Sequence, residues 1–151
     1  MSAGKLAPDW LKPVEDAVSE HGGQGVFVVL FSVYRPDLVK ALAHHLDLDF
    51  FDFRAQVMVK LGADAGTLEL EALERSMSSR AHRRGIALMN AEALMAVKPA
   101  ADRRRWLRRA LGLALRYPAV VPLTIFAADA PIDDSRVVDL APDALPEQSL
   151  V

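Results

Sequence analysis

The sequence predicts an α/β fold, a three-layer sandwich in which helices cover both faces of a mostly parallel β-sheet. Short apolar runs alternate along the chain with segments whose apolar residues recur at helical spacing. The runs are apolar throughout, which is typical of strands buried on both faces. The segments between them are long enough for the helical crossovers that parallel strands require.

The size and composition predict one domain spanning residues 1–151. The chain has 151 residues and 52% apolar content, enough to form a single core. It contains no cysteine, which excludes disulfides and thiolate metal sites. Acidic residues among the first twenty argue against a signal peptide, and no apolar run has the length of a bilayer span. We therefore expect a cytoplasmic protein with no membrane partner.

The first half of the chain predicts two helices and two strands. Residues 9–20 carry an apolar stripe at helical spacing, and a glycine-rich turn follows them. Residues 26–31, VFVVLF, predict the first buried strand. A second helix is expected over residues 38–46 with Asp37 as its N-cap, and residues 48–53 predict a second strand.

The middle of the chain predicts two helices and a short strand. Residues 55–66 indicate a short helix and a turn. The apolar spacing from Thr67 through Ala81 predicts a longer helix, which Gly85 ends. Residues 86–89, IALM, are apolar throughout and predict a third strand.

The remaining regular elements are two helices and a last strand. Residues 91–98 indicate a helix that the following proline terminates, and residues 101–116 predict a longer one. Residues 119–128 predict a buried strand. Because proline cannot donate a hydrogen bond within a central ladder, Pro122 is expected to mark its start.

Charge is distributed unevenly along the chain. Residues 75–116 hold eleven of the 18 Lys and Arg residues and only two acids, Glu92 and Asp102. Residues 129–151 contain one arginine among six acids, together with prolines, and indicate an acidic C-terminal tail or arm.

The polar residues after the predicted strands form the candidate site. Ligands of parallel sheets bind outside the carboxyl ends of the strands. The joint after the first strand supplies candidate phosphate-binding residues, and the next two strands are followed by acids and an amide. The candidates are Ser32, Tyr34 and Arg35 at the joint, then Asp52, Asn90 and Glu92.

The segment from Leu38 to Arg54, LVKALAHHLDLDFFDFR, follows an apolar strand and a joint. This order resembles the P-loop NTPases, especially the shikimate-kinase-like small-molecule kinases. The resemblance implies a P-loop-NTPase-like fold with a substrate-region acid at Asp52, and ATP with Mg²⁺ in a member that is active.

The phosphate loop itself departs from the family pattern. The positions of the family's final glycine, lysine and hydroxyl residue fall on Tyr34, Arg35 and Pro36, and Asp37 follows them. Tyr34 adds bulk, Pro36 lacks an amide donor and Asp37 repels phosphate, so only the cation is retained. Asn90 stands where the resemblance implies an aspartate that organises magnesium. The joint therefore predicts a pseudoenzyme without cofactor or metal.

The resulting hypothesis is a P-loop-like binding or scaffolding subunit that acts with a partner protein, such as an ATPase or a nucleic-acid-processing complex. The alternative is a phosphoryl-transfer or nucleotide-binding enzyme with an atypical loop. It would use Arg35 to hold phosphate, Asp52 or Asp37 as a base, and Glu92 to position water or a metal.

A third hypothesis concerns the arginine-rich helix. A face of exposed arginines binds nucleic acid through counterion release, with affinity that falls steeply as salt rises. The simpler interpretation is a solvated face that pairs with the acidic tail or with the glutamates of residues 69–74, while Trp106 lies in the core. The arginines concerned are Arg104, Arg105, Arg108 and Arg109.

Overall fold

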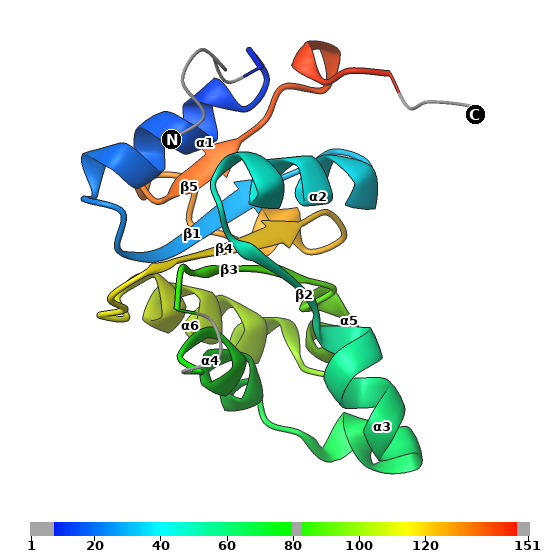
Figure 1. Cartoon of the computed structure of the whole chain (residues 1–151). Helices are drawn as coiled ribbons and strands as arrows, with labels where there is room; N and C mark the ends of the chain where they lie inside the picture. Colours follow the sequence, from blue (N-terminus) through cyan, green and yellow to red (C-terminus); the bar gives the residue numbers. More distant parts are fainter. Residues whose placement is uncertain (1–7, 80–82, 148–151) are drawn as a thin grey trace.

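The sheet is parallel and five-stranded in the computed structural model, which describes residues 8–79 and 83–147 (Figure 1). The strand order is β2-β3-β4-β1-β5, and each neighbouring pair is parallel. The strands are β1 (Gly25–Leu30), β2 (Asp49–Asp52), β3 (Ile86–Met89), β4 (Pro118–Leu123) and β5 (Val137–Asp139). The predicted α/β class with a parallel sheet is confirmed.

Helices cover both faces of this sheet (Figure 1). They are α1 (Lys12–Glu20), α2 (Pro36–His45), α3 (Val59–Leu61), α4 (Glu71–Met77), α5 (Glu92–Met95) and α6 (Ala100–Leu111). α1 and α2 pack on one face, and α4, α5 and α6 pack on the other, which gives the expected three layers. Among the described helices, none combines the length and the apolar character needed to cross a membrane.

The interior strand β1 shows why its sequence is apolar at every position. Phe27 and Val29 belong to the core under α1 and α2, whereas Val26 and Val28 belong to the core under α4, α5 and α6. All four side chains are completely buried. Successive side chains of a strand point to opposite faces, so a strand covered on both sides has no polar position.

The crossovers define where a ligand or partner would meet the sheet. The connection leaving the carboxyl end of β1 runs through α2 on one face, whereas the connection leaving the carboxyl end of β3 runs through α5 and α6 on the other, and β4 lies between these two strands. In open α/β sheets such a divergence creates a crevice at the carboxyl ends of the strands. The loops that follow β1 and β4 therefore border the expected crevice.

Some predicted helix boundaries were wrong. α2 begins at Pro36, so Arg35 occupies the cap position without a side-chain capping bond, and Asp37 lies in the first turn. α4 begins only at Glu71, because the chain before it forms a 3-10 helix, Gly62–Thr67. Ala81 lies outside the described residues. The helix predicted over residues 101–116 is α6, and it ends earlier, at Leu111.

The prediction that Pro122 marks the start of the last strand was wrong, since Pro122 lies inside β4. The β3–β4 register joins Ile86 with Ala119 and Ala87 with Val120. Pro122 lies beyond these pairs, so its missing N–H interrupts no bond of that ladder. In addition, β5 was not predicted, and it pairs in parallel with β1 within the acidic stretch of residues 129–151.

Candidate functional site

Three of the candidate residues meet at the carboxyl edge of the sheet. The Tyr34 hydroxyl donates to Asn90 Oδ1 at 2.9 Å, and Asn90 Nδ2 donates to Asp52 Oδ1, also at 2.9 Å. The same Asp52 oxygen accepts the N–H of Ala55 at 3.1 Å. Asn90 adopts a left-handed backbone conformation with φ of 63°, which asparagine tolerates better than most residues. The contacts form a continuous chain from the end of β1 to the end of β2.

This chain of hydrogen bonds runs along the carboxyl edge of the sheet. Tyr34 follows β1 and Asn90 follows β3, and β4 lies between those two strands. Neighbouring strands are about 4.8 Å apart, so a contact between the first and third of three strands spans roughly 10 Å. The Tyr34–Asn90 contact therefore lies across the carboxyl end of β4.

Arg35, the cation of the joint, is already bound within the chain. Its Nε and Nη2 atoms donate to the two carboxylate oxygens of Asp37, each at 3.0 Å. Its Nη1 donates to the carbonyl oxygen of Pro146 at 2.8 Å, and the side chain is only 10% exposed. The hydrogen bond from Arg35 lowers the pKa of Asp37, and the same bond raises the pKa of Arg35. Ser32 is exposed nearby and makes no side-chain hydrogen bond within the described residues.

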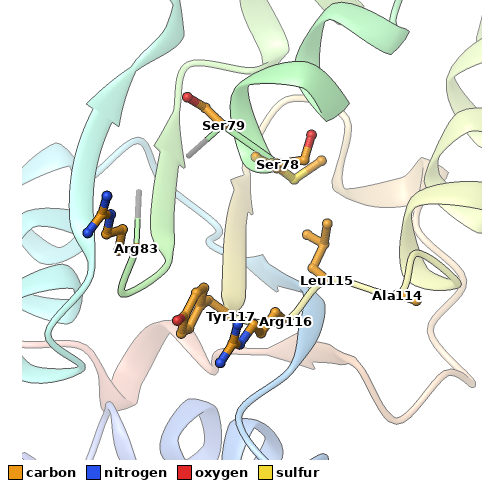
Figure 2. A pocket seen from close by; sticks show the side chains of 8 residues that line it. Ser78, Ser79, Arg83, Ala114, Leu115, Arg116 and Tyr117 are labelled. Carbon is orange, nitrogen blue, oxygen red and sulfur yellow. The ribbon is translucent and has the colours of Figure 1, made fainter. Parts of the chain in front are cut away.

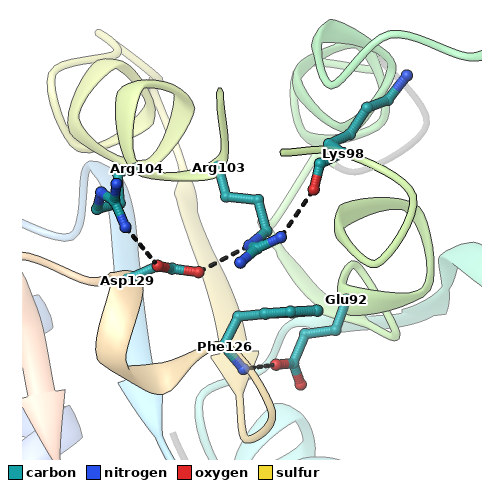
Figure 3. Close-up of polar contacts among 6 residues, drawn as sticks. All are labelled: Glu92, Lys98, Arg103, Arg104, Phe126 and Asp129. Carbon is teal, nitrogen blue, oxygen red and sulfur yellow. Dashed lines mark hydrogen bonds and ion pairs between the residues drawn. The ribbon is translucent and has the colours of Figure 1, made fainter. Parts of the chain in front are cut away.

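Glu92 holds the loop that follows β4. Its two carboxylate oxygens accept the N–H groups of Thr124 at 2.8 Å and Phe126 at 2.6 Å, and Figure 3 shows the second of these contacts. A carboxylate that accepts two backbone donors satisfies groups that a loop otherwise leaves to water. Glu92 therefore fixes the backbone on both sides of Ile125.

A second group of contacts ties the same loop to α6 (Figure 3). Arg103 Nε donates to Asp129 at 2.7 Å, and its Nη1 donates to the carbonyl oxygen of Lys98 at 2.7 Å. Its guanidinium also lies 4.2 Å from the centre of the Phe126 ring. Sequence reasoning did not single out Arg103 or Asp129. The one available signal was the location of Arg103 in the basic helix.

The remaining arginines of α6 are largely paired with acids. Arg104 contacts Asp129 at 3.5 Å, Arg105 contacts Asp102 at 3.2 Å and Arg109 contacts Glu74 at 3.2 Å. Arg108 is exposed and has no ion pair within the described part of the chain. The pairs with Glu74 and Asp129 are of the kind expected for a solvated face, and they reduce the positive charge offered to a nucleic acid.

The prediction that Trp106 of α6 lies in the core is confirmed. Trp106 is buried in the core, and its Nε1 donates to Glu74 Oε1 at 3.1 Å.

Three exposed apolar side chains lie on the loops that follow the adjacent strands β1 and β4. We define the carboxyl-edge patch as Val33, Tyr34 and Ile125, which are 60%, 53% and 76% exposed. Val33 and Tyr34 follow β1, and Ile125 follows the adjacent β4. Apolar side chains exposed on neighbouring loops mark sites of binding more often than scattered single residues do.

The carboxylates at the carboxyl edge of the sheet accept hydrogen bonds from backbone and side-chain donors of this chain. Asp52, Asp37 and Glu92 each accept at least two hydrogen bonds. Over residues 8–79 and 83–147 no group of three His, Asp or Glu side chains is arranged to hold a metal ion. Comparisons with protein-family models, curated proteins and solved structures give no match.

Proposed function

We propose that this protein is a non-catalytic, P-loop-like subunit that binds a partner protein through the carboxyl edge of its sheet. The observation that carries this proposal is the Tyr34–Asn90 hydrogen bond across the end of β4. A phosphate chain bound in the family's manner would lie against the joint and this strand end. Here the Tyr34–Asn90 contact crosses that position.

The chemistry of the joint supports the same conclusion. Phosphate binding at a strand–helix joint depends on converging amide donors and a free cation. Pro36 lacks the donor at the first position of α2, and Arg35 is committed to Asp37 and to the carbonyl of Pro146. A phosphate group would have to replace a two-point carboxylate contact while facing the charge of Asp37.

The carboxyl-edge patch supports a protein as the partner. Ile125 projects into solvent from a backbone that Glu92 holds at the residues before and after it. A side chain presented from an ordered loop loses little conformational freedom on binding. Tyr34 adds an aromatic surface of the type enriched at the centres of interfaces.

The first test measures nucleotide binding. ATP with Mg²⁺ is expected to show no binding that depends on the joint, because the Tyr34–Asn90 contact crosses the end of β4 and Arg35 is occupied. Isothermal titration calorimetry of the wild-type chain and of Arg35→Ala measures this directly. Arg54→Ala is the control, since Arg54 is exposed and has no ion pair among the described residues. Micromolar affinity that disappears in Arg35→Ala but persists in Arg54→Ala would contradict the proposal and favour the enzyme alternative.

The second test addresses the partner. Placing a charge at the centre of the patch with Ile125→Asp is expected to weaken the complex with a co-purified partner at least about tenfold, as at an interface hot spot. Ile132→Asp is the matched control, since Ile132 is 78% exposed but lies before β5. Dissociation constants for the two variants and the wild type decide the question. Equal affinity for all three would place the interface elsewhere.

A further inference from the structure

Hydrogen bonds join the carboxyl-edge patch to a helical segment that follows β2. We define the α3 segment as residues 54–67, which comprise a π-helix, the short helix α3 and a 3-10 helix. It extends away from the sheet (Figure 1), and Ala65 is its one buried residue. π-helical turns are rare and are often found at functional sites. The first turn of the α3 segment is bonded to the end of β2, because the N–H of Ala55 donates to Asp52 Oδ1 at 3.1 Å.

The side-chain amide of Asn90 has a fixed orientation in this set of contacts. An ionised carboxylate only accepts hydrogen bonds, so the Nδ2 group of Asn90 faces Asp52 and its Oδ1 atom faces Tyr34. The Tyr34 hydroxyl is therefore the donor of its contact with Asn90. One planar amide thus holds the patch residue on one side and the carboxylate that binds the α3 segment on the other.

The backbone beneath this amide is held in place. The next residue, Ala91, is completely buried, and the carbonyl oxygen of Asn90 accepts the N–H of Ala93 at 3.1 Å. Asn90 also has a φ of 63°, a left-handed conformation that few residue types adopt readily. Because the backbone is fixed and the amide is planar, the two contacts of Asn90 change together when its side chain turns.

We propose that Asn90 is a positioning residue that couples the carboxyl-edge patch to the α3 segment. This inference rests on the proposed function, because the partner is what engages Tyr34. When the partner binds the Tyr34 hydroxyl, Asn90 loses its donor and turns away from Asp52, and the first turn of the α3 segment is released. Binding at the patch then changes how the chain presents Val59 and Leu61, which are 66% and 42% exposed on this segment.

The test removes single contacts from the full chain and measures hydrogen exchange at the amide of Ala55 by NMR, with no partner present. Tyr34→Phe removes only the hydroxyl, and exchange is expected to accelerate at least about twofold, the lower end of coupling through hydrogen-bond networks. Asn90→Gly removes both side-chain contacts but tolerates the left-handed backbone. It is expected to accelerate exchange about fivefold, as for the loss of one hydrogen bond. Asn90→Asp is expected to have a similar effect, because its carboxylate repels that of Asp52.

Tyr117→Phe is the matched control and is expected to leave exchange at Ala55 unchanged. Tyr117 is 41% exposed, lines a hollow at the opposite, amino-terminal edge of the sheet (Figure 2), and its hydroxyl makes no hydrogen bond within the described residues.

Three results would overturn the coupling. They are unchanged exchange at Ala55 in Tyr34→Phe or Asn90→Gly, equal acceleration in Tyr117→Phe, and equal acceleration at the amide of Val28 in β1, which would indicate a general loss of stability. All of these variants leave Ile125 intact. The affinity of Ile125→Asp for the partner therefore tests the proposed function separately, and a chain without the coupling can still bind through the patch.

Discussion

Gly85→Ala is expected to lower the free energy of unfolding by about 2–4 kcal/mol, through backbone strain together with overpacking. Gly85 has a φ of 109°, a conformation that side-chain-bearing residues rarely adopt. A Cβ at this position would collide with the carbonyl oxygen of Pro118 and lie 2.8 Å from a methyl carbon of Leu48. The Gly85 carbonyl also accepts the N–H of Asp49 at 3.0 Å, so a backbone shift would disturb the start of β2.

Urea unfolding followed by circular dichroism measures this loss. Gly66→Ala is the control, because Gly66 has no positive φ and no atom lies within 4 Å of a Cβ built there. Its expected effect is about 0.5 kcal/mol or less in either direction. Similar losses in the two variants would show that the close approach of Gly85 to Pro118 has no special energetic role.

The fold class was predictable because burial on both faces leaves a direct trace in the sequence. A strand covered by helices on each side must be apolar at consecutive positions, as β1 and β3 are. Helical spacing then identified the segments that cover the sheet, including α6 with its buried Trp106.

The sequence of the edge strand β5 contains no comparable run of buried apolar residues. It is three residues long, and Val138 is its one buried residue. Its assignment depends on pairing with β1, more than one hundred residues earlier, which local sequence does not encode. The prediction for Pro122 was wrong for a related reason. Pro122 lies past the last residue of β4 that pairs with β3, and the extent of that pairing is not encoded in the local sequence.

The location of the candidate site was predictable from the sequence, but the hydrogen bonds of its residues were not. Topology alone brings residues after parallel strands to one edge, which is why Tyr34, Asn90 and Asp52 meet. The engagement of Arg35 by Pro146 joins residues far apart in the sequence. Such contacts depend on tertiary structure, so spacing between residues does not reveal them.

Glu92→Gln is expected to destabilise the protein by about 2–3 kcal/mol, because one of two charge-assisted backbone contacts is lost. The amide group of glutamine retains one acceptor oxygen and places an N–H₂ group against the other backbone donor. Either the N–H of Thr124 or that of Phe126 then lacks its partner. Hydrogen exchange at these two amides is expected to accelerate, and urea unfolding measures the global loss.

This result also separates a structural role of Glu92 from the catalytic role in the enzyme alternative. A catalytic carboxylate replaced by its isosteric amide commonly loses turnover while folding stability is little changed. A carboxylate that holds the β4 loop instead loses stability, and with it the ordered presentation of Ile125. Glu20→Gln, an exposed acid at the end of α1, is the control and is expected to change stability by about 0.5 kcal/mol or less. Unchanged stability and unchanged amide exchange in Glu92→Gln would contradict the structural role and return Glu92 to the set of candidate catalytic acids.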